Sequence, residues 1–137
     1  PNTFLFDVSY RPSPVGYDWF YSRTLELTAE NGAVYPHIIA SIYQYHDDIQ
    51  EDKIVYGELA ALVDCMKRRA NQIKIDDLEE LKNLSRQDEE SDTELDLSKY
   101  LNQYQFPAET RSPVLLLSYV RPQHARIFYA CMDAPQL

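Results

Sequence analysis

Glycine is scarce in this chain, and its three glycines, Gly16, Gly32 and Gly57, lie far apart. Loops that cradle phosphate groups need clustered glycines, because the backbone must approach the ligand closely. The sequence therefore excludes nucleotide binding through a P-loop or a Rossmann loop.

Cysteine and histidine are scarce as well. Cys65 and Cys131 are too few for a disulfide scaffold, and each lies in an apolar stretch, which predicts two buried thiols that pack as small hydrophobic groups. Their separation does not forbid a bridge between them. The histidines at 37, 46 and 124 lack the short spacing of zinc ligands. We therefore expect no metal and no other cofactor.

No apolar run is long enough to cross a bilayer, since the longest, residues 113–117, has the length of a strand. Residues 1–10 lack the basic start and apolar core of a secretion signal. The sequence therefore predicts a cytoplasmic protein without a membrane partner.

The size and composition are those of an ordinary globular protein. The chain has 137 residues, of which 45% are hydrophobic and 26% charged. A chain of this length buries enough surface to fold without a disulfide or a metal. We expect a single α+β domain over residues 1–137.

Alternating apolar and polar residues predict strands over 3–10 and in the second half of 17–28. Asn31-Gly32 predicts a tight turn that leads into a hairpin, because both residues tolerate positive φ. The stretch from Pro36 to His46 fits either a strand or a helix. Its isoleucines and tyrosines favour the strand, which we adopt, whereas Pro36 also fits the first position of a helix.

The central segment has helical periodicity. Helices are predicted from residue 57, from 76 and from 91, and Pro107 ends the last. The apolar stripe of the first helix comprises Leu59, Leu62, Val63, Met66, Ala70 and Ile73. Strands over 114–120 and 126–132 follow, the first of them central in the sheet because it is apolar on both faces. The pattern indicates an α+β fold with a mainly antiparallel sheet from the N- and C-terminal strands, covered on one face by about three helices.

Negative charge is concentrated in the middle of the chain. The net charge is −9, and residues 76–96, called here the acidic segment, hold ten acidic residues against Lys82 and Arg86. This balance opposes direct binding of nucleic acid, whose affinity depends on neutralised phosphates. Acidic helix surfaces also serve solubility alone, and the sequence leaves both interpretations open.

A concentrated negative surface attracts basic partners. The sequence therefore predicts a stoichiometric inhibitor that occludes a basic protein, such as a nuclease or another nucleic-acid-binding protein. Immunity proteins that neutralise nuclease toxins are similar in size, charge and lack of catalytic motifs, which is an analogy from composition. The predicted contact residues are acidic side chains and two tyrosine anchors: Asp76, Asp77, Glu79, Glu80, Asp88, Glu89, Glu90, Asp92, Glu94, Asp96, Tyr100 and Tyr104. At least one of these tyrosines also fits a position in a helix core.

Two alternatives belong to other functional classes. Arg121, His124 and Arg126, with Tyr119, form a basic patch near the last hairpin, which fits a phosphate- or nucleotide-handling enzyme with His124 as acid–base. The same patch fits a hairpin rim whose arginines pair with the acidic helices nearby, and this interpretation is favoured. The aromatic segment 17–21 fits the interface of an adaptor or an oligomer subunit. The sequence does not define the oligomeric state.

Overall fold

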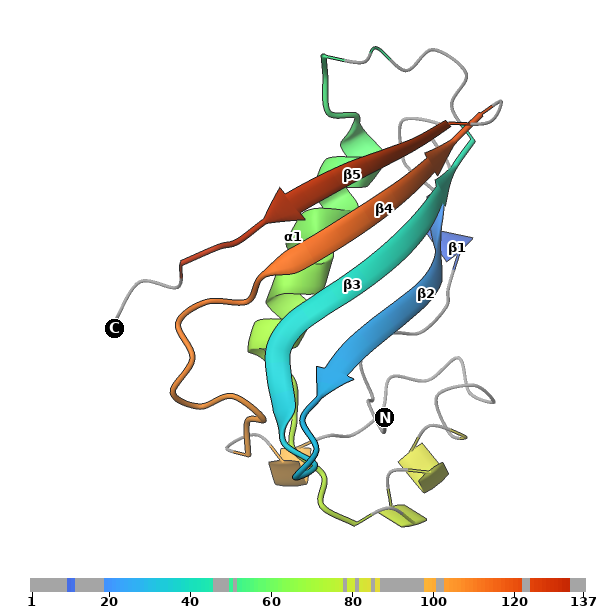
Figure 1. Ribbon diagram of the computed structural model, residues 1–137. Coiled ribbons are helices and arrows are strands. Elements are labelled where there is room, and N and C mark those ends of the chain that lie inside the picture. Colours follow the sequence, from blue (N-terminus) through green and yellow to red (C-terminus); the bar gives the residue numbers. More distant parts are fainter. Residues whose placement is uncertain are drawn as a thin grey trace.

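The fold is that of a computed structural model, which describes residues 10–11, 19–45, 50, 52–77, 79–80, 82–84, 86, 98–100, 103–121 and 124–133. These residues form one five-stranded sheet, with α-helix α1 against one of its faces (Figure 1). The elements, in chain order, are β1 (Tyr10–Arg11), β2 (Trp19–Thr28), β3 (Val34–Gln44), α1 (Tyr56–Ala70), the 3₁₀ helix η1 (Ser98–Tyr100), β4 (Val114–Val120) and β5 (His124–Ala130).

The strands lie in sequence order across the sheet, β1-β2-β3-β4-β5. β1/β2, β2/β3 and β4/β5 are antiparallel, whereas β3 and β4 are parallel. Parallel neighbours need a crossover connection, and α1 lies in the connection between β3 and β4. The α+β class is therefore confirmed, and β4 lies inside the sheet as predicted.

The N-terminal half follows the predicted strands. The chain turns at Gly32, whose φ of +83° is the conformation that favours glycine, and the amide of Ala33 donates to Oδ1 of Asn31 at 3.0 Å. The ambiguous stretch after the turn is a strand, β3, so the strand prediction is confirmed. Residues 3–9 of the first predicted strand lie outside the described residues, and Tyr10–Arg11 forms the short β1.

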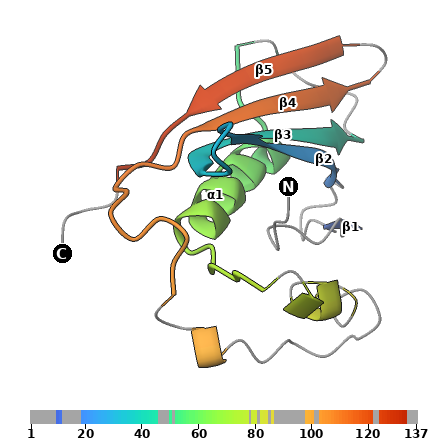
Figure 2. The ribbon, with the colours of Figure 1, turned by 60° about the horizontal axis from the view of Figure 1, so that its bottom comes forward.

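The prediction of about three helices on the sheet is not confirmed. Among the described residues, α1 packs on the sheet, while the described parts of 79–86 and η1 lie on the far side of α1 (Figure 2). The third predicted helix does not extend to Tyr104. Ile73 and Tyr104 form an isolated antiparallel bridge, flanked by backbone hydrogen bonds from Lys74 to Gln103 (2.7 Å) and from Gln105 to Gln72 (2.8 Å). This pairing keeps the chain extended.

The buried face of α1 is rotated from the predicted stripe. Leu59 and Val63 are half exposed, and the buried side contains polar residues as well as apolar ones: Gly57, Glu58, Ala61, Leu62, Cys65, Met66 and Arg69. A stripe drawn from apolar residues alone misses Glu58 and Arg69, whose charges are paired inside the protein. Both cysteines are free thiols, and Cys131 is exposed, contrary to the prediction that both are buried.

Two buried ion pairs hold α1 against the sheet, one near each end. Near its start, the carboxylate of Glu58 lies 3.0 Å from Nη1 of Arg126 on β5. Near its end, the guanidinium of Arg69 pairs with Glu26 on β2. No helix among the described residues has the length and apolar character to span a membrane.

Candidate functional site: the open face of the sheet

The face of the sheet that points away from α1 is built from rows of paired side chains. Residues paired across neighbouring strands point to the same side, so the strand register defines the rows. Three rows cross from β2 to β5: Phe20, Tyr43, Tyr119, Ala125; Arg23, Ser41, Leu117, Ile127; and Leu25, Ile39, Leu115, Tyr129. We call these residues the open face.

The open face is apolar and accessible. Leu25 is 60% exposed, and Ile127 and Tyr129 are each 70% exposed. The rows contain no carboxylate, and Arg23 is their single charged residue. The helical parts of the described chain lie on the other side of the sheet (Figures 1 and 2). Contiguous exposed apolar surface of this kind is uncommon on monomeric proteins, which makes this face the candidate site.

One row of the open face is an aromatic ladder. The ring centroids of Phe20 and Tyr43 are 5.2 Å apart with 25° between the ring planes, and those of Tyr43 and Tyr119 are 5.2 Å apart with 30°. Tyr45, just past the end of β3, adds a ring centred 5.7 Å from that of Phe20. Rings at these distances pack against one another and present an aromatic surface to a ligand or partner.

A hollow of about 440 Å³ lies at the end of this row. It occurs there because β3 and β4 are parallel, so the residues that end both strands meet at one edge of the sheet. We call it the strand-end hollow, and its lining comprises Tyr43, Gln44, Tyr45, Tyr119, Val120, Arg121, His124 and Ala125.

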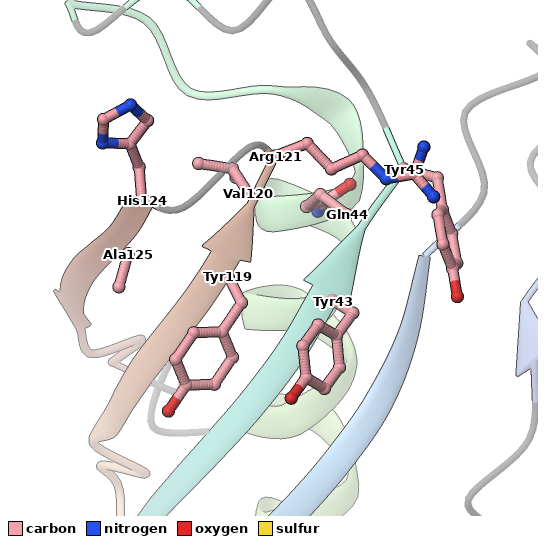
Figure 3. A pocket seen from close by; sticks show the side chains of 8 residues that line it. All are labelled: Tyr43, Gln44, Tyr45, Tyr119, Val120, Arg121, His124 and Ala125. Carbon is pink, nitrogen blue, oxygen red and sulfur yellow. The ribbon is translucent and has the colours of Figure 1, made fainter.

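Tyrosine rings and one guanidinium dominate the strand-end hollow. In Figure 3, Tyr43 and Tyr119 lie side by side with their hydroxyl groups directed the same way, and Arg121 extends toward Tyr45. Cζ of Arg121 is 5.0 Å from the centroid of the Tyr45 ring, a cation–π contact. The lining offers ring faces, hydrogen-bond donors and a cation, which suit binding.

The basic patch predicted near the last hairpin is divided by the structure. Tyr119, Arg121 and His124 line the strand-end hollow. Arg126 instead points toward α1, where it pairs with Glu58 and its Nη2 donates to the carbonyl of Lys53 at 2.5 Å. Among the described residues, the lining of the strand-end hollow has no thiol, carboxylate or aliphatic hydroxyl that could act as a nucleophile, and no group of three side chains could hold a metal ion.

The described carboxylates of the acidic segment form ion pairs and hydrogen bonds with groups of the same chain. Asp76 pairs with Lys74 at 3.1 Å, Glu79 with Lys82 at 2.9 Å, and Glu80 with Lys99. Oδ1 of Asp77 accepts from the backbone amides of Glu79 and Glu80 at 2.8 and 3.3 Å. The hydrogen bond from Lys99 lowers the pKa of Glu80. The other predicted acidic contacts lie outside the described residues: Asp88, Glu89, Glu90, Asp92, Glu94 and Asp96.

The predicted aromatic anchors are placed differently from one another. Tyr100 is 5% exposed and therefore packs inside, whereas Tyr104 is 41% exposed. In the aromatic segment 17–21, Trp19 and Tyr21 are buried in the core, so these two rings cannot form the predicted interface. Phe20 belongs to the aromatic ladder of the open face.

Comparison of the chain with family models, curated proteins and solved structures finds no match.

Proposed function

We propose that this protein is a small acidic binding protein that docks on a basic protein partner through the open face. The exposure of this apolar face is the observation that carries the proposal. Burying one large apolar side chain contributes about 1.5–3 kcal/mol, so a partner that covers several of the exposed residues gains substantial binding free energy.

The distribution of charge supports such an interface. The centre of a protein interface is depleted of charged residues, while the summed charge of the rest of the chain raises the rate of encounter with an oppositely charged partner. The open face has no carboxylate in its rows, although the chain carries a net charge of −9. In this proposal the carboxylates attract a basic partner, and the apolar rows provide the contact.

The partner class follows from this chemistry. A basic protein with an apolar patch beside its cationic groove, such as a nuclease or another nucleic-acid-binding protein, would be held at that patch, and the acidic chain would then exclude its anionic substrate. We propose stoichiometric inhibition as the mechanism, in the cytoplasm. The acidic segment then acts mainly by accelerating association.

Affinity capture from an extract of the source organism, at low and at high ionic strength, tests the proposal. We expect a basic protein to be captured at low salt, identified by mass spectrometry, and to bind with one-to-one stoichiometry when both proteins are purified. A variant with Asp76→Asn, Asp77→Asn, Glu79→Gln and Glu80→Gln should associate more slowly and with weaker salt dependence.

Three results would contradict the proposal. The captured protein could be acidic, or the neutralised variant could associate as fast as the wild type at every ionic strength. A mass that rises with concentration in the absence of a partner would instead assign the open face to contact between copies of this chain.

A further inference from the structure

The strand-end hollow has the dimensions of a ligand site. Its volume of about 440 Å³ falls within the range of roughly 300–1,000 Å³ typical of small-molecule pockets. It lies where two parallel strands end, which is the usual place for ligands in open sheets with parallel strands. Its size suits one small organic molecule.

The lining provides a surface for a planar ring. The rings of Tyr43 and Tyr119 are centred 5.2 Å apart and lie side by side (Figure 3), and both residues are more than a third exposed, so part of each ring is open to a ligand. A planar aromatic group placed against them would extend the ladder. Such stacking contributes about 1–3 kcal/mol for a base on an aromatic side chain.

The lining also provides a cation. Arg68, Arg69, Arg111 and Arg126 form ion pairs with carboxylates, whereas none of the ion pairs among the described residues includes Arg121. Arg121 is held instead against the ring of Tyr45 and lines the strand-end hollow. A guanidinium without a carboxylate partner is suited to a bidentate contact with phosphate or carboxylate.

We propose that the strand-end hollow binds a small planar aromatic anion, with its ring stacked on Tyr43 and Tyr119 and its phosphate or carboxylate paired with Arg121. His124, which lines the same hollow, adds a hydrogen-bond donor or acceptor at its rim. This site goes beyond the proposed docking function, because it needs no protein partner. A polyanion is disfavoured by the net charge of −9.

The test is a titration of the isotope-labelled protein, followed by NMR, with adenosine monophosphate, adenosine, inorganic phosphate and indole-3-acetate. We expect saturable shifts of amides near residues 43–45 and 119–125 with adenosine monophosphate or indole-3-acetate. Adenosine has the planar base without the anion, and inorganic phosphate has the anion without the base. Each should therefore bind at least about tenfold more weakly. Which of the two anions binds more tightly distinguishes a phosphate ligand from a carboxylate ligand.

Three variants locate the interaction. Arg121→Gln should weaken binding of the preferred anion about tenfold or more and change adenosine binding little, whereas Tyr119→Leu should weaken both. Arg23→Gln is the matched control, because Arg23 is also exposed on the open face but lies outside the strand-end hollow. Thermal unfolding of each variant confirms that it is folded.

The proposal is overturned if no probe gives saturable shifts up to about 10 mM, or if Arg121→Gln and Arg23→Gln bind the anion equally well. Tighter binding of a single-stranded oligonucleotide than of the mononucleotide would also contradict it. Failure of this proposal is distinguishable from failure of the docking proposal, which is tested at Ile127, in a row of the open face that does not line the strand-end hollow.

Discussion

Arg126 on the edge strand β5 and Glu58 in the first turn of α1 form an ion pair between the sheet and the helix, with Nη1 3.0 Å from Oε2. Glu58 is fully buried, and the same Oε2 accepts the backbone amide of Val55 at 3.0 Å. One carboxylate therefore caps α1 and ties the helix to the edge of the sheet.

Replacing Glu58 with Gln should destabilise the protein. A glutamine oxygen can still accept from Val55, but the charge of Arg126 loses its partner in a largely buried position, at a cost of roughly 3 kcal/mol. Urea unfolding measures the loss. The double variant with Arg126→Gln should recover part of it, and a loss below about 1 kcal/mol in the single variant would show that the pair contributes little.

Arg69 should be more important for stability than its neighbour Arg68. Arg69 is fully buried, pairs with Glu26, and donates to the carbonyl of Pro36 at 3.2 Å and to Oε1 of Gln72 at 2.6 Å. Arg69→Met should cost about 3–5 kcal/mol, because it leaves the Glu26 carboxylate buried without a countercharge.

Arg68→Met is the matched control for that variant. Arg68 pairs with Asp64 at 3.0 Å on a partly exposed surface of the same helix, where an ion pair contributes about 0.5 kcal/mol. Equal unfolding midpoints for the two variants in urea would contradict the assignment of Arg69 as the anchor of this end of α1.

Gly57→Ala tests how closely the start of α1 approaches β3. A Cβ at this position would lie 2.5 Å from Nε2 and 2.7 Å from Oε1 of Gln44, so the end of that side chain must move. The side chain is flexible and also lines the strand-end hollow, so its movement should cost little more than the roughly 1 kcal/mol by which helix propensity favours alanine. We therefore expect Gly57→Ala to change the stability by less than about 1 kcal/mol, and to stabilise the protein when it is combined with Gln44→Ala. Calorimetry of the single and double variants measures both effects, and a loss above about 2 kcal/mol in Gly57→Ala would contradict this expectation.

The protein should lose stability at alkaline pH through a buried thiol. Sγ of Cys65 lies 3.4 Å from the hydroxyl of Tyr21, and burial raises the pKa of Cys65 from 9.0 to about 11. The folded state holds the Cys65 proton more tightly than the unfolded state does. The protonated thiol therefore makes its full contribution to the free energy of unfolding below pH 9, and this contribution is lost as the pH rises toward 11. Burial also raises the pKa of Tyr21, in the same direction.

Unfolding in urea at several alkaline pH values measures this loss. Cys65→Ala should reduce the loss of stability with rising pH, whereas Cys131→Ala, which removes an exposed thiol, should leave that loss unchanged. At neutral pH a thiol reagent should modify Cys131 rapidly and Cys65 slowly. Equal modification rates would contradict the burial of Cys65.

The strands were predictable because turn residues and alternation are local signals. Asn31-Gly32 placed the β2–β3 hairpin, and the apolar run at the start of β4 placed that strand inside the sheet. The parallel direction of the β3/β4 pairing was not predictable, because it depends on where the chain re-enters the sheet after α1. The helix prediction failed at residue 104, because the bridge between Ile73 and Tyr104 joins residues distant in sequence.

The site was only partly predictable. Tyr119, Arg121 and His124 were grouped from their proximity in sequence, and the structure brings them to one hollow. Their companions Tyr43 and Tyr45 come from β3 and its end, which only the strand register reveals. The open face had one signal in the sequence, since outward positions such as Leu25 and Ile127 are apolar where a solvated face would be polar.

The central claim, that the open face is the contact surface, is tested most directly by the affinity of single variants for the captured partner, measured by calorimetric titration. Ile127→Asp places a charge in the middle row, and Val63→Asp makes the same change at a half-exposed position on α1, on the other side of the molecule. We predict at least about a thirtyfold weaker complex for Ile127→Asp, equivalent to about 2 kcal/mol, and unchanged affinity for Val63→Asp. Unchanged affinity for Ile127→Asp, with both variants folded, would contradict it.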